Sequence, residues 1–245
     1  SALIPGARMG TPLVLAGGQT GSIARLDDAG GVTPVVRLGN RLPDKKYFVG
    51  SKLSQVRTLA DGRIVFGQDL FAFESGVYTW NNGTIELTVP APLTDPSGKR
   101  MGYVNSLEVN RQGDVLFLTG FAGSGIFRVR DGRTTHVGTT PLVVDGVEVT
   151  GFPNSLAIDG TGRASFSTTK DGVGPYQVLW DGAESHIILS PDSKTTDGRI
   201  ISGVGASRGC GDGLIMGALG TYLQFRTGGW QYLAVALPAF HFFLP

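Results

Sequence analysis

Residues Asn105 to Leu142 decide the fold, and they read NSLEVNRQGDVLFLTGFAGSGIFRVRDGRTTHVGTTPL. Short runs rich in Val, Ile, Leu and Phe alternate in this stretch with turns that contain glycine. Such runs predict β-strands, and an Asp-Gly pair between two of them predicts a tight hairpin. No apolar period of 3.6 residues extends over ten or more residues, which argues against a helix. We therefore expect a four-stranded antiparallel meander.

The same pattern recurs along the chain. A second copy starts at Ser51 and reads SKLSQVRTLADGRIVFGQDLFAFESGVYTWNNGTIELTVPAP, and a third starts at Asn154 and reads NSLAIDGTGRASFSTTKDGVGPYQVLWDGAESHIILSPD. Weaker copies start at Gly10 and Ser202. The chain is thus interpreted as five diverged repeats, each of roughly 50 residues, which is a period typical of solenoids and propellers.

Two features of the repeats have a physical reason. Asn82-Gly83, Asp131-Gly132 and Asp181-Gly182 are predicted to place two residues with positive φ in two-residue hairpin turns, whose twist matches that of the strands. A phenylalanine also recurs at one place in three repeats, at Phe66, Phe117 and Phe166. We expect these rings in the core between neighbouring sheets.

A lone four-stranded sheet cannot cover both of its faces, whereas radial stacking buries them against neighbouring sheets. The sequence therefore predicts an all-β fold, a five-bladed β-propeller of four-stranded antiparallel blades, with a six-bladed or partner-completed propeller as the alternative. We expect one domain, 1–245. The approximate blades are 1–40, 51–92, 102–142, 151–192 and 200–240. Their connections are expected on one rim, where loops on a rigid scaffold tolerate variation and carry binding sites.

Composition limits the function. The net charge is +1 and charged residues make up 17% of the chain, so clustered Lys and Arg that would bind nucleic acid are not expected. No apolar run approaches the roughly 18 residues of a membrane helix, and we expect no membrane span. The N-terminus lacks the pattern of a signal peptide. We expect an exported protein, extracellular or periplasmic, from which that peptide has been removed.

The stretch VVRLGNRLPDKKYFVGSKLSQVRTLADGRIVFGQDLFAFESGVYTWNNGTIELTV resembles the repeats of large secreted proteins of acidobacteria, planctomycetes and myxobacteria. Those repeats alternate a G-d-x-x-P loop, an l-N-x-x-G-x-V-a-F strand pair and a G-i-y-x-w-x-x-G hairpin. The resemblance covers most of the chain. It implies export and no particular chemistry.

A looser similarity, in FPNSLAIDGTGRASFSTT and YVNSLEVNRQGDVLFLTG, is to NHL and SMP-30/gluconolactonase propellers. In SMP-30-like lactonases an Asn at the start of an inner strand helps a Glu and an Asp to hold a divalent metal over the channel. The resemblance places Asn105 and Asn154 at the corresponding position. The acids nearest to them in sequence are Glu108, Asp145 and Glu148, and strand alternation turns Glu108 away from Asn105.

We expect ligand contacts, rather than catalysis, at Asn105, Asn154, Tyr47, Tyr103 and Phe152. The aromatic rings could stack on sugars, and each could instead seat an inner strand against its blade. Similarly, each Asn side chain could bond the backbone where the chain enters a strand. The sequence holds no metal-binding motif with His, Cys or Asp at a recognised spacing.

These features predict a non-enzymatic extracellular propeller. It would serve as a binding or structural module that binds glycans or forms part of a larger secreted assembly. Its partners would be carbohydrate, another protein or a second copy of itself. We expect no catalytic residue, no metal and no cofactor. The alternative is an SMP-30-like metal-dependent lactonase or hydrolase with its site at the central channel mouth, where Asn105 and Asn154 hold one divalent cation such as Ca²⁺.

Overall fold

The computed structural model describes most of the chain. The described residues are 2–4, 13–16, 22–26, 31–37, 39–43, 53–69, 75–89, 94–95, 97–100, 102–120, 125–194, 198, 200–201, 207–210, 213–218, 221–226 and 229–232. Tyr47, one of the expected ligand contacts, lies outside them.

The described residues form five four-stranded sheets, in each of which consecutive strands pair antiparallel. The first contains β1 (Ala2–Ile4), β2 (Leu13–Ala16), β3 (Ser22–Leu26) and β4 (Val32–Val36). The second contains β5 (Leu53–Thr58), β6 (Ile64–Asp69), β7 (Ser75–Asn81) and β8 (Thr84–Val89). The third contains β9 (Tyr103–Val109), β10 (Val115–Gly120), β11 (Gly125–Arg130) and β12 (Arg133–Thr139). The fourth contains β15 (Asn154–Ile158), β16 (Ala164–Lys170), β17 (Val173–Trp180) and β18 (Ser185–Leu189). The fifth contains β19 (Ser207–Cys210), β20 (Gly213–Ala218), β21 (Thr221–Arg226) and β22 (Gly229–Tyr232).

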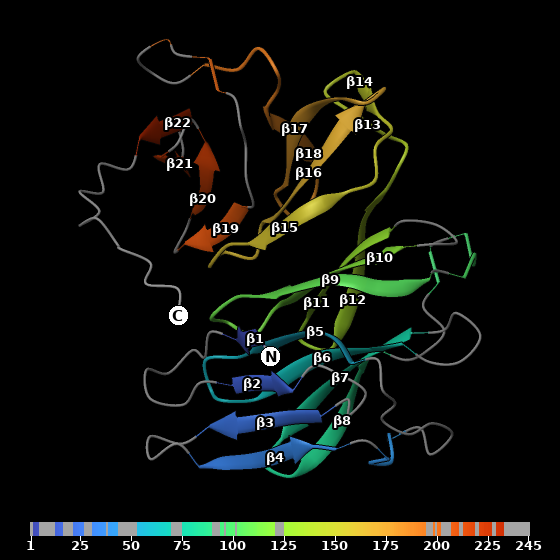
Figure 1. Cartoon of the computed structure of the whole chain (residues 1–245). Coiled ribbons are helices and arrows are strands. Elements are labelled where there is room, and N and C mark those ends of the chain that lie inside the picture. Colours follow the sequence, from blue (N-terminus) through green and yellow to red (C-terminus); the bar gives the residue numbers. More distant parts are fainter. Residues whose placement is uncertain are drawn as a thin grey trace.

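The sheets are arranged side by side around a common centre (Figure 1), and the first strand of each sheet lies nearest to it. Strand β9 contacts β5 on one side and β15 on the other, and β15 also contacts β19. This arrangement is that of a β-propeller, and the described residues contain no helix. The expected all-β fold of four-stranded antiparallel blades is confirmed, while the blade number of a complete ring stays a prediction.

Large apolar side chains fill the spaces between neighbouring sheets. One cluster joins the first two sheets and contains Phe66, another joins the second and third and contains Phe117, and a third joins the third and fourth and contains Phe166. All three rings are fully buried. Each contributes roughly 1.5–3 kcal/mol by burial. The predicted role of these rings between sheets is confirmed.

The hairpin turns follow their sequence in two of the three predicted cases. Asn82 and Gly83 have φ values of 45° and 97°, and Asp131 and Gly132 have values of 50° and 72°. Asp181-Gly182 differs, because Trp180 pairs with Ser185 and the loop is longer than two residues. There the Asp181 carboxylate accepts hydrogen bonds from the backbone N–H groups of Ala183 and Glu184, both at 2.9 Å, so a side chain closes the turn.

The connection between the third and fourth sheets is itself a hairpin, of β13 (Leu142–Val144) and β14 (Val147–Val149). Its turn residue Asp145 accepts a hydrogen bond of 2.7 Å from the backbone N–H of Ile187 and lies 3.3 Å from His186 Nδ1. Both partners belong to β18, the outer strand of the fourth sheet. The turn of the hairpin is therefore anchored on the outer strand, while Val144 and Val149 pack into the buried cluster between the third and fourth sheets.

No helix among the described residues has the length and apolar character needed to cross a membrane.

Candidate functional site

A β-bulge interrupts the first strand of three sheets near its beginning. In β9, Val104 pairs with Thr119 and Ser106 with Leu118, so Asn105 is the extra residue. The pairings of β5 and β15 shift one residue later in the repeat, between Ser54 and Val56 and between Asn154 and Ala157. Bulges re-aim side chains and occur often beside functional sites. The bulge of β9 thus takes Asn105 out of the regular ladder, whereas Asn154 stays paired with Ser167.

Asn105 and Phe152 meet over Gly120. A Cβ on Gly120 would lie 2.0 Å from Asn105 Nδ2 and 3.0 Å from Phe152 Cζ, so only glycine leaves room for both side chains. Asn105 is exposed, and Phe152 keeps 49% of its surface exposed. The structure therefore brings together two of the expected ligand contacts, one from the third sheet and one from the approach to the fourth.

The other expected contacts have structural partners. The side-chain oxygen of Asn154 accepts a hydrogen bond from Ser167 Oγ, which also donates to the Asn154 backbone carbonyl at 3.2 Å. Tyr103 is the first residue of β9 rather than part of a loop, where it pairs with Gly120 and is partly buried. The amide of Asn154 is thus used across two strands of its own sheet.

The acids considered for the channel mouth lie elsewhere. Glu108 forms a two-pronged ion pair with Arg57, at 2.8 and 3.1 Å, between the third and second sheets. Asp145 is held at β18, and Glu148 is exposed on β14. In the part of the chain that the structure describes, no group of three or more His, Cys, Asp or Glu side chains could hold a metal ion. The described residues therefore do not provide the carboxylate set of an SMP-30-like metal site.

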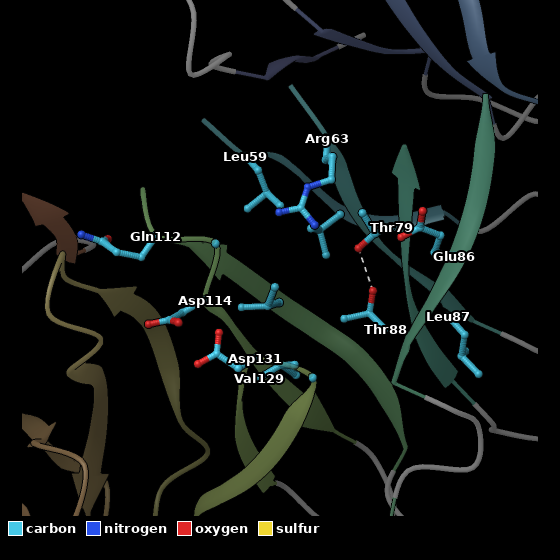
Figure 2. A pocket seen from close by; sticks show the side chains of 14 residues that line it. Leu59, Arg63, Thr79, Glu86, Leu87, Thr88, Gln112, Asp114, Val129 and Asp131 are labelled. Atoms are coloured by element: carbon cyan, nitrogen blue, oxygen red, sulfur yellow. Dashed lines mark hydrogen bonds between the residues drawn. The ribbon is translucent and has the colours of Figure 1, made fainter. Parts of the chain in front are cut away.

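A cavity of about 340 Å³ opens between the second and third sheets, and we call it the inter-sheet pocket. Figure 2 shows Thr79 and Thr88 on the side of the second sheet and Asp114 and Asp131 on the side of the third. The Thr79 and Thr88 hydroxyls are 2.7 Å apart and hydrogen-bonded. Its lining residues are Leu59, Arg63, Val65, Thr79, Glu86, Leu87, Thr88, Gln112, Gly113, Asp114, Val115, Val129, Asp131 and Gly132.

In the neighbouring interfaces an arginine and a tryptophan meet at the corresponding place. Between the third and fourth sheets, Arg128 stacks on Trp180, with its guanidinium carbon 4.6 Å from the ring centroid. Between the first and second sheets, Arg25 lies 5.5 Å from the ring of Trp80. We call this arrangement the Arg–Trp clamp. Cation–π contacts of this kind contribute about 0.5–2 kcal/mol, depending on burial.

Both members of the clamp are replaced by small side chains at the interface that holds the pocket. Counted from the bulge that each third strand makes with its fourth, Thr79 occupies the position of Arg25 and Arg128. Val129 occupies the position of Trp80 and Trp180, since all three pair with the first residue of the second strand. Both Thr79 and Val129 line the cavity. The sequence did not predict this site. Aligning the third strands of the repeats would have shown that Thr79 stands in place of an arginine and Val129 in place of a tryptophan.

Charge in the pocket is unevenly compensated. Asp114, only 5% exposed, accepts two hydrogen bonds from Arg130, at 2.8 and 2.5 Å. The hydrogen bond to Asp114 raises the pKa of Arg130 above its ordinary value. Arg63 donates to Asp61 at 2.7 Å. Arg63, the one cation among the lining residues, is therefore held by a carboxylate, and Glu86 and Asp131 add negative charge.

Comparison with solved structures supports the fold at low sequence identity. A candidate gluconolactonase is 13% identical with a TM-score of 0.51, and the alignment covers 96% of this chain and 78% of that one. The extracellular domain of a one-component system from B. thetaiotaomicron is 16% identical with a TM-score of 0.50, over 91% and 27%. A calcium-binding protein, regucalcin, from Agrobacterium tumefaciens is 15% identical with a TM-score of 0.48, over 96% and 72%. No protein-family model and no curated protein matches the sequence.

These comparisons correct one expectation, that the protein uses no cofactor. Proteins with this fold include one that is described as calcium-binding, so the fold does not support an expectation that no cation is bound. The similarity to SMP-30/gluconolactonase-like propellers is confirmed at the level of the fold. The resemblance to secreted acidobacterial repeats stays a prediction.

Proposed function

We propose that this protein is a non-enzymatic extracellular propeller that binds a small polar ligand in the inter-sheet pocket. The observation that carries the proposal is the cavity of about 340 Å³ at an interface where the Arg–Trp clamp of two neighbouring interfaces is replaced by Thr79 and Val129. Ligand sites of this size combine apolar walls with a few converging polar groups. Similarity in fold to an extracellular domain supports the location.

The pocket has the walls and the polar groups that such a site needs. Leu59, Val65, Val115 and Val129 belong to the buried cluster between the second and third sheets, which makes one wall rigid and apolar. Thr79, Thr88 and Gln112 supply hydroxyl and amide groups, and charged side chains stand at the edge. A preformed cavity of this kind costs little reorganisation when a ligand enters.

The proposal is tested by ligand-observed NMR with a panel of monosaccharides, amino acids, polyamines and nucleosides at millimolar concentration. We expect at least one class to bind, and Val129→Trp to abolish that binding because it fills the cavity with the side chain found at the equivalent positions. Asn105→Ala, at the centre of the fold, is the matched control and should retain binding. Binding that survives Val129→Trp but not Asn105→Ala would move the site to the channel mouth.

A metal-dependent hydrolase is the second candidate, and the bulge that exposes Asn105 beside Phe152 favours it. Asn105 and Asn154 would be its metal ligands, but the described residues bring no carboxylate to them, and hard cations such as Ca²⁺ need several oxygens and usually negative charge. Elemental analysis of protein purified without chelator decides between the candidates. One equivalent of Ca, Mn or Zn that is lost in Asn105→Ala would favour the hydrolase, and metal-free protein would favour the binding module.

A further inference from the structure

We propose that the inter-sheet pocket recognises a guanidinium group, as carried by arginine or by an arginine side chain of a peptide. The inference rests on the proposed function, since it names the ligand class of the same pocket. It comes from a comparison within the molecule, because the fold builds a guanidinium site at the same place in two other interfaces.

The two occupied sites show what the fold offers to a guanidinium. Arg128 Nη1 donates a 2.9 Å hydrogen bond to the carbonyl of Gly162, the turn glycine between the first two strands of the next sheet. Arg25 Nη2 makes the corresponding contact with the carbonyl of Gly62, at 3.5 Å. In each case the guanidinium comes from the preceding sheet and also lies over a tryptophan ring. The turn carbonyl is therefore a guanidinium acceptor in this repeat.

The pocket presents the same acceptor. Gly113 is the turn glycine of the third sheet, and its φ of 93° matches the 88° of Gly62 and the 87° of Gly162. The three turns therefore have the same conformation, and Gly113 lines the pocket. Thr79, whose hydroxyl bonds Thr88, stands where the capping arginine stands in the other two interfaces. Arg63 Nη2 also lies near this turn, 3.7 Å from the position of a Cβ on Gly113, but Arg63 is paired with Asp61. A guanidinium from a ligand can take the place that Arg25 and Arg128 take elsewhere.

The charges around the pocket select for a cation. The lining cation Arg63 is held by Asp61, and the lining carboxylate Asp114 is held by Arg130. The remaining charges of the lining are Asp131 and Glu86, which accepts a neutral hydrogen bond of 3.1 Å from Asn81. An anionic ligand would meet both carboxylates without a free cation to receive it. A planar guanidinium with five N–H donors can bond a carbonyl and a carboxylate together, and it is more weakly hydrated than an ammonium group. Hydrogen bonds with an ionised acceptor are roughly twice as strong as neutral ones.

The experiment titrates the whole chain with N-acetyl-arginine amide and with N-acetyl-citrulline amide, which has the same shape but a neutral urea group. We expect the arginine compound to bind at least tenfold more tightly, and Glu86→Gln with Asp131→Asn to reduce that difference to less than threefold. Equal binding of the two compounds would overturn the inference and leave the proposed function standing. If sugars or nucleosides bound and neither the arginine nor the citrulline compound did, the inference would also be overturned and the proposed function would stand.

A second variant protects the test against loss of folding. Thr79→Arg with Val129→Trp rebuilds the Arg–Trp clamp, so we expect a protein with a raised Tm that no longer binds N-acetyl-arginine amide. A lowered Tm, or retained binding, would show that the pocket is not the vacated guanidinium site. Free L-arginine distinguishes the source of the ligand: weaker binding than that of the blocked compound indicates a peptide residue, and tighter binding indicates the free amino acid. Both of these results support the guanidinium.

Discussion

The interface between the second and third sheets and the interface between the third and fourth are built on the same backbone, yet one is open and the other closed. In the closed interface, Arg128 stacks on Trp180 and bonds the Gly162 carbonyl. In the open one, Thr79 and Val129 stand at the equivalent positions and leave a cavity of about 340 Å³. The comparison shows that equivalent positions of the repeat hold an arginine and a tryptophan at one interface and two small side chains at the other.

A second difference concerns the turn that each interface covers. Around Gly162 the loop is held by Arg130, which donates to the Thr161 carbonyl at 3.0 Å and to Asp114, and by Asn110, which donates to the Asp159 carbonyl at 2.9 Å. Around Gly113 the nearest side chain is Arg63. The closed interface therefore concentrates hydrogen bonds that the open interface does not have at the same place.

The largest expected effect comes from breaking the closed interface at its ring. Trp180→Ala should lower the free energy of unfolding by about 3–5 kcal/mol, because it removes a buried aromatic side chain and the surface on which Arg128 stacks. Urea unfolding followed by circular dichroism measures it. Thr79→Ala in the open interface is the control and should cost less, about 1–2 kcal/mol, for the lost hydrogen bond to Thr88. Comparable losses would contradict the difference between the interfaces.

The carboxylate that joins the third sheet to the fourth comes next. Asp114→Ala should cost about 2–3 kcal/mol, since Asp114 is 5% exposed and its loss leaves Arg130 and Asn110 without their shared acceptor. The figure is lower than for a fully buried pair because Arg130 is 38% exposed. Asp61→Ala is the matched control, because the Asp61–Arg63 pair is exposed and such pairs contribute about 0–1 kcal/mol. If Asp114→Ala and Asp61→Ala lowered the free energy of unfolding equally, burial would not explain the difference in strength expected between the two ion pairs.

The turn glycines offer a direct comparison of the two interfaces. A Cβ on Gly162 would lie 2.1 Å from Arg130 Nη2 and 2.6 Å from Asp114 Oδ2, whereas a Cβ on Gly113 meets only Arg63 Nη2, at 3.7 Å. Both glycines have positive φ, so either change to alanine costs about 1 kcal/mol of backbone strain. Gly162→Ala should cost at least about 1 kcal/mol more, for the displaced ion pair. Thermal unfolding of the two variants measures the difference, and identical Tm values would refute it.

The smallest effect is a pH dependence in the sheet that both interfaces share. Burial lowers the pKa of His136 below its ordinary 6.5, with Asp95 acting in the opposite direction. The unfolded chain therefore takes up this proton more readily than the folded one. The stabilising contribution is complete above about pH 6.5 and falls as the pH drops from there toward the lowered folded pKa. Unfolding free energies at pH 5 and pH 8 should differ less in His136→Gln than in the natural chain, and an unchanged difference would assign it to other groups.

Much of the fold could be predicted from the residues because its signals are local. The Asn82-Gly83 and Asp131-Gly132 turns need only their own two residues to adopt positive φ. Phe66, Phe117 and Phe166 are recognised as core because repeats place them identically. Asp181-Gly182 was predicted wrongly, because the carboxylate of Asp181 competes with the backbone for the turn's N–H groups. The hairpin of β13 and β14 was missed since its Asp145 is anchored on a strand some forty residues away.

In the candidate site, too, some residues could be predicted from the sequence, whereas the contacts of others could not. Asn105 and Phe152 were identified from their place in the repeat, and the structure brings them together over Gly120. The partners of Glu108 and Asn154 could not be read from spacing, since they depend on which strand faces which.

The amino-acid sequence by itself determined the repeat, the antiparallel meander, the turn glycines and the phenylalanines of the core, because each follows from the conformational preference or apolar character of residues close together in the chain. Only the tertiary structure decided which side chains meet across neighbouring sheets. Arg128 and Trp180, or Thr79 and Val129, are about fifty residues apart, and their summed volumes become meaningful only once the sheets stack. The pocket is a property of that pairing, and the residues on either side carry no local signal for it.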